Sequence, residues 1–222
     1  MHPIVVECER RHDENLIPRA EKCERIHVKR RKQKGCEHMK YCETVENHYT
    51  EHWAAPIERI QWSKGPVADL PAGFQVLVIA RTREMLAFAT CCMSQPTDEF
   101  RLELHLFASF ADANKRRRSL AELLTAVAHY HRTGGVLGLG HSVNFGKPWL
   151  PGSTCTHGII SLPYLDGPSL EYLEPTQTRF LWLIPVTAAE VKFKQRNGLE
   201  ALEECFEKRQ FDYLNPMRSS VV

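Results

Sequence analysis

The 222-residue sequence lacks any segment that could cross a membrane or direct secretion. Its longest apolar runs, such as residues 180–186, fall far short of the ~18 residues needed to span a bilayer. At the N-terminus, a short apolar stretch at residues 4–6 passes directly into charged residues, unlike a secretory signal peptide. Repeats and internal linkers are also missing. We therefore expect a soluble, cytoplasmic protein with no membrane partner.

The common phosphate-binding and hydrolase motifs are missing as well. Gly138 and Gly140 are followed by Val143 where the dinucleotide-binding fingerprint requires Gly or Ala, and there is no Walker A sequence. The Gly-x-Ser-x-Gly nucleophile elbow does not occur either. The sequence therefore predicts no nucleotide or other cofactor.

One short segment does place reactive residue types near one another. Residues 152–157 contain Cys155 and His157, but neighbours along a loop seldom face each other, and the next acid that could orient a histidine is Asp166. We interpret the segment as turn residues and a packed thiol, and we predict a protein that is not an enzyme. The alternative is a hydrolase-type enzyme that uses His141, His157 and Cys155.

Charge of one sign is not in excess over most of the chain. The formal net charge is +2, but residues 1–34 hold ten Lys or Arg and six Asp or Glu, so the remainder has a net charge of −2. Such a body has no broad basic surface for nucleic acid. Residues 1–40 are dense in charge and include a basic run at 29–34, so we predict a solvated extension, disordered or in part helical. The alternative is a regulator whose basic tail contacts nucleic acid.

Eight cysteines are present, an even number that would allow disulfides. Because no signal peptide precedes them, we predict reduced thiols in a cytoplasmic protein. Cys91 and Cys92 are adjacent in an apolar run, where a strand would point their side chains to opposite faces.

Four possible zinc ligands follow one another near the start of the predicted body: Cys36, Cys42, His48 and His52. Structural zinc sites use cysteine pairs separated by about two to four residues, whereas five residues separate this pair. We therefore predict packed or solvent-facing histidines and no metal.

The folded body is predicted over residues 41–222, because apolar periodicity begins near Tyr41. Ser119 with Glu122, and Thr187 with Glu190, have the spacing of capping boxes that begin helices. The patterns predict helices over 41–53, 119–133, 187–198 and 199–206, strands over 57–62, 74–80, 85–93, 100–107, 158–162 and 180–185, and an ordered loop over 138–158. This order predicts an α/β (α+β) domain with one mixed β-sheet flanked by helices.

Aromatic side chains gather around the predicted loop, and they are our candidates for a binding site. Rigid aromatic side chains on ordered loops are common anchors for a protein partner. The candidate binding residues are Tyr130, His141, Phe145, Trp149 and Tyr164. The alternative is that these side chains complete the core, and the sequence leaves both roles open.

Motifs in the C-terminal half resemble the suppressor-of-fused family. Residues 140–153 (GHSVNFGKPWLPGS) are similar to the family's Gly-His segment and the loop after it, and residues 158–164 (GIISLPY) to its next strand. Residues 179–190 (RFLWLIPVTAAE) resemble the family's most recognisable run, an apolar strand followed by Pro-Ile-Thr and Glu. Residues 197–199 and 215–222 resemble the ends of bacterial members. The resemblance covers the whole predicted body and leaves out the N-terminal extension.

This resemblance implies a fold like the N-terminal domain of suppressor of fused and a function in protein binding. Eukaryotic members restrain Gli-type transcription factors and grip a short peptide as an added strand between two subdomains, the second of which has no counterpart here. Tyr130 matches a tyrosine near that peptide, but Gly140 stands where the family has an aspartate, so the eukaryotic ligand is not implied. Bacterial members often resemble immunity proteins of polymorphic toxin systems, which implies a cognate toxin as the partner. The oligomeric state is not indicated.

Overall fold

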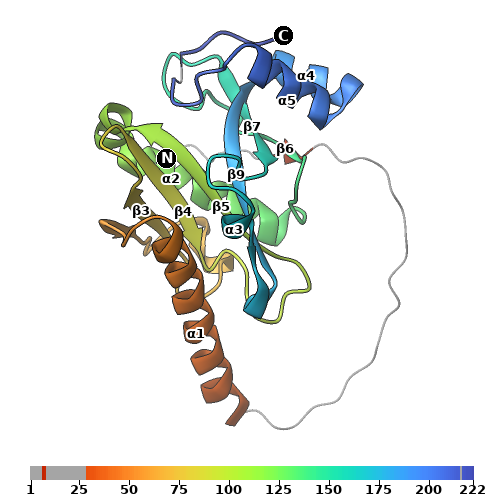
Figure 1. Ribbon diagram of the computed structural model, residues 1–222. Helices are drawn as coiled ribbons and strands as arrows, with labels where there is room; N and C mark the ends of the chain where they lie inside the picture. The colour runs from red at the N-terminus through yellow and green to blue at the C-terminus, as the bar shows by residue number, and fades with distance from the viewer. Residues whose placement is uncertain (1–6, 9–28, 216) are drawn as a thin grey trace.

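The computed structural model describes residues 7–8, 29–215 and 217–222, and it forms one mixed β-sheet with helices on both faces (Figure 1). The helices are α1 (Lys29–His52), α2 (Phe110–Thr133), α3 (Pro168–Glu171), α4 (Ala188–Asn197) and α5 (Leu199–Lys208), with short 3₁₀ turns at Pro66–Asp69 and Glu174–Thr176. The strands are β1 (Glu7–Cys8), β2 (Glu58–Ile60), β3 (Gln75–Ala80), β4 (Met85–Cys91), β5 (Arg101–Ser109), β6 (Ser142–Asn144), β7 (Cys155–Ser161), β8 (Tyr172–Leu173) and β9 (Thr178–Thr187). The predicted mixed sheet flanked by helices is confirmed.

The sheet is built from two halves that meet at its centre. In the described part of the chain the strand order is β1-β6-β7-β9-β5-β4-β3-β2, and β8 pairs with β9 outside this path. β5 and β9 are parallel, with His105 opposite Trp182, and the other pairs are antiparallel. Because parallel neighbours need a long crossover, α2 and the strands β6 to β8 all lie between β5 and β9 in sequence.

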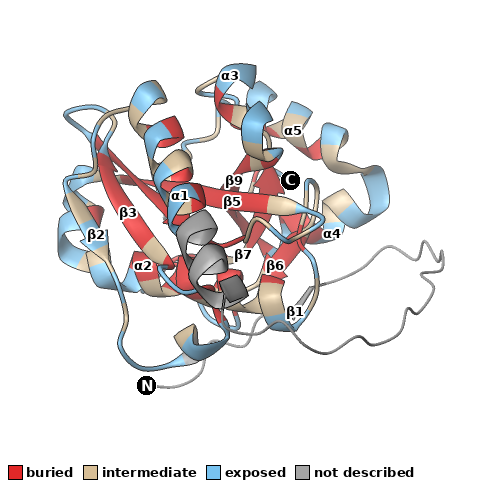
Figure 2. Ribbon diagram, turned by 90° about the horizontal axis from the view of Figure 1, so that it is seen from below, coloured by how far each residue is buried: buried red, intermediate tan, exposed pale blue. Residues whose placement is uncertain are grey.

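The two faces of the sheet carry different helices. α2 covers one face, while α1, α4 and α5 pack on the other. β9 contributes to both cores by strand alternation, because Leu181 and Leu183 face α2 whereas Phe180 and Trp182 face the opposite way. Figure 2 shows the central strands as buried and the outward faces of the helices as exposed. None of the described helices is long and apolar enough to cross a membrane.

Helix α1 begins further upstream than the predicted body. It runs over Lys29–His52, so the basic run at residues 29–34 is helical. Its described buried side chains nevertheless begin at Tyr41, where we place the start of the folded body. Residues 1–6 and 9–28 of the predicted extension lie outside the described residues, so the domain boundary remains a prediction.

The prediction that Ser119 caps the helix after β5 is wrong. Ser109 is the N-cap of α2, because its hydroxyl accepts a hydrogen bond from the backbone N–H of Asp112 at 3.1 Å. Arg116 has non-helical angles (φ −133°, ψ 20°), which kink the helix before its apolar part. Apolar periodicity begins only after the kink, so the sequence predicts a shorter helix that starts there. The end of α2 at Thr133 is as predicted.

The loop predicted over residues 138–158 is also wrong in part. It contains β6 (Ser142–Asn144) and the first residues of β7 (Cys155–Ser161). A strand of three residues is too short to display an alternating pattern, so β6 could not be recognised from the sequence.

Helix α4 begins at the predicted capping box. The Glu190 carboxylate accepts from Thr187 N at 2.7 Å, and Glu190 N donates to the Thr187 hydroxyl at 3.2 Å. The same carboxylate accepts from the Arg218 guanidinium at 2.6 and 2.9 Å and from Val221 N at 3.0 Å. Because both charged side chains are buried, this ion pair fixes the segment after α5 to the start of α4.

A disulfide joins Cys42 of α1 to Cys92, so the prediction of reduced thiols is wrong for this pair. β4 ends at Cys91, and Cys92 adopts the left-handed conformation with φ 69°. The strand alternation therefore stops there, and both cysteines lie in the core cluster beneath α1 instead of on opposite faces. Cys155 and Cys205 are free thiols, as is Cys91.

Candidate binding site

A cleft of about 390 Å³ opens at the N-terminal ends of the parallel strands β5 and β9. Three separate parts of the chain line it: residues 99–102, residues 136–141, and the segment around β8 and the start of β9. The lining residues are 99–102, 136–139, His141, Tyr172, Gln177, Arg179 and Leu181. A hollow of this size is in the usual range for a ligand or side-chain pocket.

The cleft forms where the first residues of β9 extend beyond the end of its antiparallel neighbour β7. Ser161, the last residue of β7, lies opposite Trp182, so Leu181 and the residues before it extend beyond β7. The short strand β8 pairs with this part of β9 through Arg179 and Thr178. Residues 136–141, which follow α2, form the remaining wall of the cleft.

Two polar contacts hold residues 136–141 in place. Leu137 N donates to Nδ1 of His131 at 2.9 Å. Burial, together with the charge of Arg132, lowers the pKa of His131 to about 4, so the ring is neutral near pH 7, as an acceptor must be. On the other side, the Lys194 ammonium of α4 donates to the Gly140 carbonyl at 2.6 Å. The segment is therefore tied to helices on both faces of the sheet.

The two arginines that line the cleft are already engaged within the protein. Arg101 donates to the carbonyls of Pro96 at 2.5 Å and Thr176 at 2.6 Å, which fixes the opposite wall. Arg179 pairs with the Glu171 carboxylate at 2.5 Å. Because both guanidinium groups already bind groups of the protein, they are not available to bind an anion in the cleft.

Exposed apolar side chains surround the cleft. Phe100 is 66% exposed and Val136 60%, and Tyr172 and Leu139 are 42% and 38% exposed. Large apolar side chains that gather around a hollow, with few free charges, are typical of a protein-interaction site.

His141 lines the cleft and has an unused hydrogen-bonding atom. Its Nδ1 is buried and has no hydrogen-bond partner within the described residues. Burial, and secondarily the nearby charge of Lys194, lowers the pKa of His141, so the ring is neutral. A neutral imidazole nitrogen can donate or accept one hydrogen bond, but Nδ1 is buried, so His141 contributes to the cleft as part of its lining.

Strand β6 follows His141 near the margin of the sheet, and its outer edge is occupied by β1 of the same chain. The β1 segment pairs with it in antiparallel fashion, Glu7 opposite Asn144 and Cys8 opposite Val143. Because His141 lines the cleft and directly precedes β6, the start of β6 meets the cleft, and we treat the two as one candidate site.

The five candidate residues predicted from the sequence are not gathered in one place. His141 lines the cleft, whereas Phe145 is fully buried and Trp149 is 6% exposed in the core that α2 covers. Tyr130 is partly buried against the same core. Tyr164 is exposed, and its hydroxyl donates to Glu203 of α5 at 2.9 Å. A role for these four side chains in binding stays a prediction.

The residues of the hydrolase alternative are separated. His141 lies beside Ile160, whose N–H donates to the His141 carbonyl at 2.9 Å. Cys155 is five residues along β7 from Ile160, which corresponds to roughly 16 Å for an extended strand. Cys155 is buried, and burial raises the pKa of its thiol. His157 contacts the neighbouring Thr156 hydroxyl through Nδ1 at 2.8 Å. The structure therefore does not assemble these three residues into a catalytic group.

The residues considered for zinc take other roles where their side chains are described. Cys42 is in the disulfide, and Nε2 of His48 forms a hydrogen bond with the Leu170 carbonyl at 2.9 Å. Nδ1 of His52 contacts the His48 carbonyl at 2.8 Å. Within the described part of the chain, no group of three or more His, Cys, Asp or Glu residues could hold a metal.

The sequence did not reveal the apolar residues around the cleft. The sequence predicts Phe100 as the start of a strand and Leu139 as part of the loop over residues 138–158, and it assigns Val136 to no element. One signal was available, because the three apolar residues between Gly135 and Gly140 are not needed for a turn. Their proximity to Tyr172 follows from the sheet order, which no local pattern reveals.

Comparisons with known proteins identify the chain's relatives. The sequence model of one protein family, described as Suppressor of fused protein (SUFU), matches residues 70–219, which include every residue that lines the cleft. None of the curated protein sequences matches this chain.

Among solved structures, a SUFU (suppressor of fused protein) homologue from Neisseria gonorrhoeae FA 1090 is 30% identical, with a TM-score of 0.68, over 83% of this chain and 98% of the homologue. The Sufu–Fu complex contains a chain that is 15% identical, with a TM-score of 0.56, over 83% of this chain and 92% of that chain. Drosophila Suppressor of Fused is 16% identical, with a TM-score of 0.57, over 83% of this chain and 51% of that chain. The last two likenesses show the fold alone.

Proposed function

The chain belongs to the suppressor of fused family, and from this premise we propose that it binds an extended segment of another protein along β6 and in the adjacent cleft. The observation that carries the proposal is the continuity of a strand edge with an exposed apolar cleft. One fold relative was solved in a complex, Sufu–Fu, which supports a protein as the partner.

The two parts of the site would recognise different features of such a segment. The β6 edge would supply backbone hydrogen bonds to a partner segment that takes the place of β1, and the pairing of β1 there supports this role. The cleft would select apolar side chains, because Phe100, Val136 and Leu139 project around it. His141 and Tyr172 complete this lining.

We propose further that the partner is a toxin domain and that the chain is an immunity protein that neutralises it in the cytoplasm. The resemblance of bacterial family members to immunity proteins supports this class of partner. An immunity protein needs a binding surface and no chemistry of its own, which agrees with the separation of His141, His157 and Cys155. A gene for a toxin beside the gene for this protein would add support, whereas a metabolic neighbourhood would favour the enzyme alternative.

The test uses a pair of matched double variants as bait for partner capture. Phe100→Glu with Val136→Glu places two charges at the cleft. Ile57→Glu with Met217→Glu places two charges at side chains of similar exposure, 56% and 59%, that do not line the cleft. We expect the wild type and the second variant to retain a common protein partner and the cleft variant to lose it, with at least about a tenfold weaker affinity for the purified partner.

The same partner then tests the toxin proposal. Expressed alone, it should arrest growth of the host, and co-expression of the wild-type chain, but not of the cleft variant, should restore growth. A partner that binds through the cleft without being toxic would contradict the immunity role and leave the binding proposal standing. Equal capture by both double variants would contradict the assignment of the cleft itself.

A further inference from the structure

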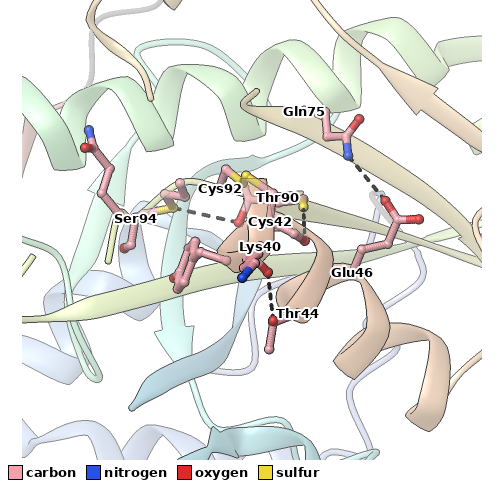
Figure 3. Close-up of a disulfide and its surroundings, with 12 residues drawn as sticks. Lys40, Cys42, Thr44, Glu46, Gln75, Thr90, Cys92 and Ser94 are labelled. Atoms are coloured by element: carbon pink, nitrogen blue, oxygen red, sulfur yellow. Dashed lines mark hydrogen bonds between the residues drawn. A yellow bond between two sulfur atoms is a disulfide. The ribbon is translucent and has the colours of Figure 1, made fainter. Parts of the chain in front are cut away.

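The Cys42–Cys92 disulfide links a helix to the sheet across 50 residues of sequence. Cys42 lies on α1 and Cys92 directly follows β4, and their Cα atoms are 5.4 Å apart, a normal span for a disulfide. Figure 3 shows the bridge between α1 and the residues around Thr90 and Ser94. The bridge therefore determines how firmly α1 is attached to the rest of the domain.

The two halves of the bridge differ in rigidity and access. Cys92 is fully buried, and its left-handed conformation turns the following N–H groups of Met93 and Ser94 toward the Glu103 carboxylate, at 3.1 and 3.3 Å. Cys42 is half-buried on α1. Cys42 is therefore the more accessible half of the bridge, while Cys92 is held in a fixed position.

The thiol next to the bridge is not poised to attack it. Cys91 is fully buried, and its Sγ donates to the Cys42 carbonyl at 3.4 Å. Burial raises the pKa of the Cys91 thiol well above its usual range, so it stays protonated at neutral pH. Cys91 is therefore not the thiol that exchanges with the Cys42–Cys92 bridge.

The non-covalent packing of α1 against the sheet includes contributions that are unfavourable to its free energy. The Tyr41 hydroxyl contacts the Thr178 hydroxyl at 3.2 Å, and Tyr41 and Tyr49 are buried. However, the Tyr49 hydroxyl and both ring nitrogens of His105, which is also buried on that face of the sheet, have no hydrogen-bond partner in the described structure. Buried polar atoms without partners oppose the packed arrangement. The covalent link therefore adds to a packed arrangement, formed by Tyr41, Val45 and Tyr49, that includes these unfavourable contributions.

We propose that the Cys42–Cys92 bridge is a thiol–disulfide switch, opened and closed by a cellular thiol of the glutathione class, which sets how firmly α1 is held on the sheet. On opening, one glutathione thiolate attacks Sγ of Cys42, and the sulfur of Cys92 leaves and takes up a proton. A second glutathione thiolate attacks the glutathione sulfur of this mixed disulfide and releases Cys42, which is protonated in turn. Two glutathione molecules are oxidised to one glutathione disulfide, and the bridge is reduced to two thiols. Closing is the reverse.

The experiment equilibrates the full-length wild type at a series of ratios of glutathione to glutathione disulfide. Alkylation and peptide mapping give the fraction of chains with the Cys42–Cys92 bridge, and hydrogen exchange reports on α1 in the same samples. We expect the bridge to open within the range of ratios found in cells, and exchange in residues 41–52 to become at least about tenfold faster as it opens. Exchange in β4 and β5 should change less than about twofold.

Two variants complete the test. Cys42→Ser should show rapid exchange in α1 at every ratio, whereas Cys205→Ser, which removes a free thiol outside the bridge, should behave as the wild type. The proposal is overturned by a bridge that never forms, one that persists at all cellular ratios, or one that joins Cys42 to Cys91 instead. It is equally overturned if the bridge opens and exchange in α1 does not change. The wild type alone provides these outcomes, so a failure of Cys42→Ser to fold does not affect the test.

Discussion

At the scale of single residues, Trp149 packs beneath α2 with its ring 5.8 Å from that of Phe145. Because its side chain is 6% exposed, Trp149→Ala should leave a cavity and lower the free energy of unfolding by about 3–5 kcal/mol. Chemical denaturation measures this loss, and titration with the captured partner measures the affinity of the folded fraction, which should not change. A stable variant that binds at least about tenfold more weakly would instead place Trp149 in the interface.

Glu103 gives the protein a pH dependence that one variant can isolate. It is fully buried, and burial raises its pKa to about 7, although hydrogen bonds from Thr90 at 2.6 Å and from Met93 N at 3.1 Å oppose the rise. The folded protein therefore keeps a proton that the unfolded chain releases above its ordinary pKa of 4.5. The contribution of Glu103 to stability therefore falls as the pH rises from about 4.5 to about 7 and is then constant, a total change of up to about 3 kcal/mol.

The variant Glu103→Gln cannot lose this proton. It should be less stable than the wild type, because its amide NH₂ faces the Ser94 N–H, but the difference between the two should shrink by up to about 3 kcal/mol between pH 4.5 and 7.5. Denaturation at a series of pH values measures the difference. His105 and His131 have lowered pKa values of about 3 and 4, which make stability rise with pH up to about 6.5. These opposite contributions occur in both proteins, so they cancel in the difference. A difference that is independent of pH would show that Glu103 does not titrate in this range.

At the scale of elements, the buried pair Arg218–Glu190 fixes the segment after α5 to the start of α4. Arg218→Met should lower the free energy of unfolding by about 3–5 kcal/mol, because it leaves the buried Glu190 carboxylate without its counterion. Arg59→Met, which removes the exposed pair with Glu46, should cost less than about 1 kcal/mol and serves as the control. Equal losses in the two variants, measured by denaturation, would mean that burial of the first pair has no energetic consequence.

Elements with a complete apolar period could be predicted from the sequence, and elements without one could not. β9 and the apolar part of α2 display continuous buried patterns, and the Thr187–Glu190 spacing gave the start of α4. The first turns of α2 are dominated by charge, and the kink at Arg116 breaks their phase with the rest. β6 and β8 are too short to have a period. The cleft escaped prediction for a different reason, because its walls meet through the strand order, and of its residues the sequence indicated His141 alone.

At the scale of the whole molecule, residues 1–40 contribute charge, and none of their described side chains is buried in the core. The described buried side chains of α1 begin at Tyr41, and residues 1–34 have a net charge of +4. Deletion of residues 1–40 should therefore change the midpoint of thermal unfolding by a few degrees at most, since little apolar area is lost. Calorimetry of the full-length and shortened proteins makes the comparison. Loss of a cooperative transition in the shortened protein would move the boundary of the domain upstream.

The parallel pairing of β5 with β9 has a consequence for synthesis on the ribosome. About 70 residues separate Ser109 at the end of β5 from Thr178 at the start of β9. At 5–20 residues per second, β5 waits about 4–14 s for its neighbour. During that interval β3, β4 and β5 can pair and α2 can cover one face, but the remaining edge of β5, with its row of apolar residues, stays open. The nascent chain therefore passes through a state in which self-association competes with folding, and slower translation of the second half prolongs it.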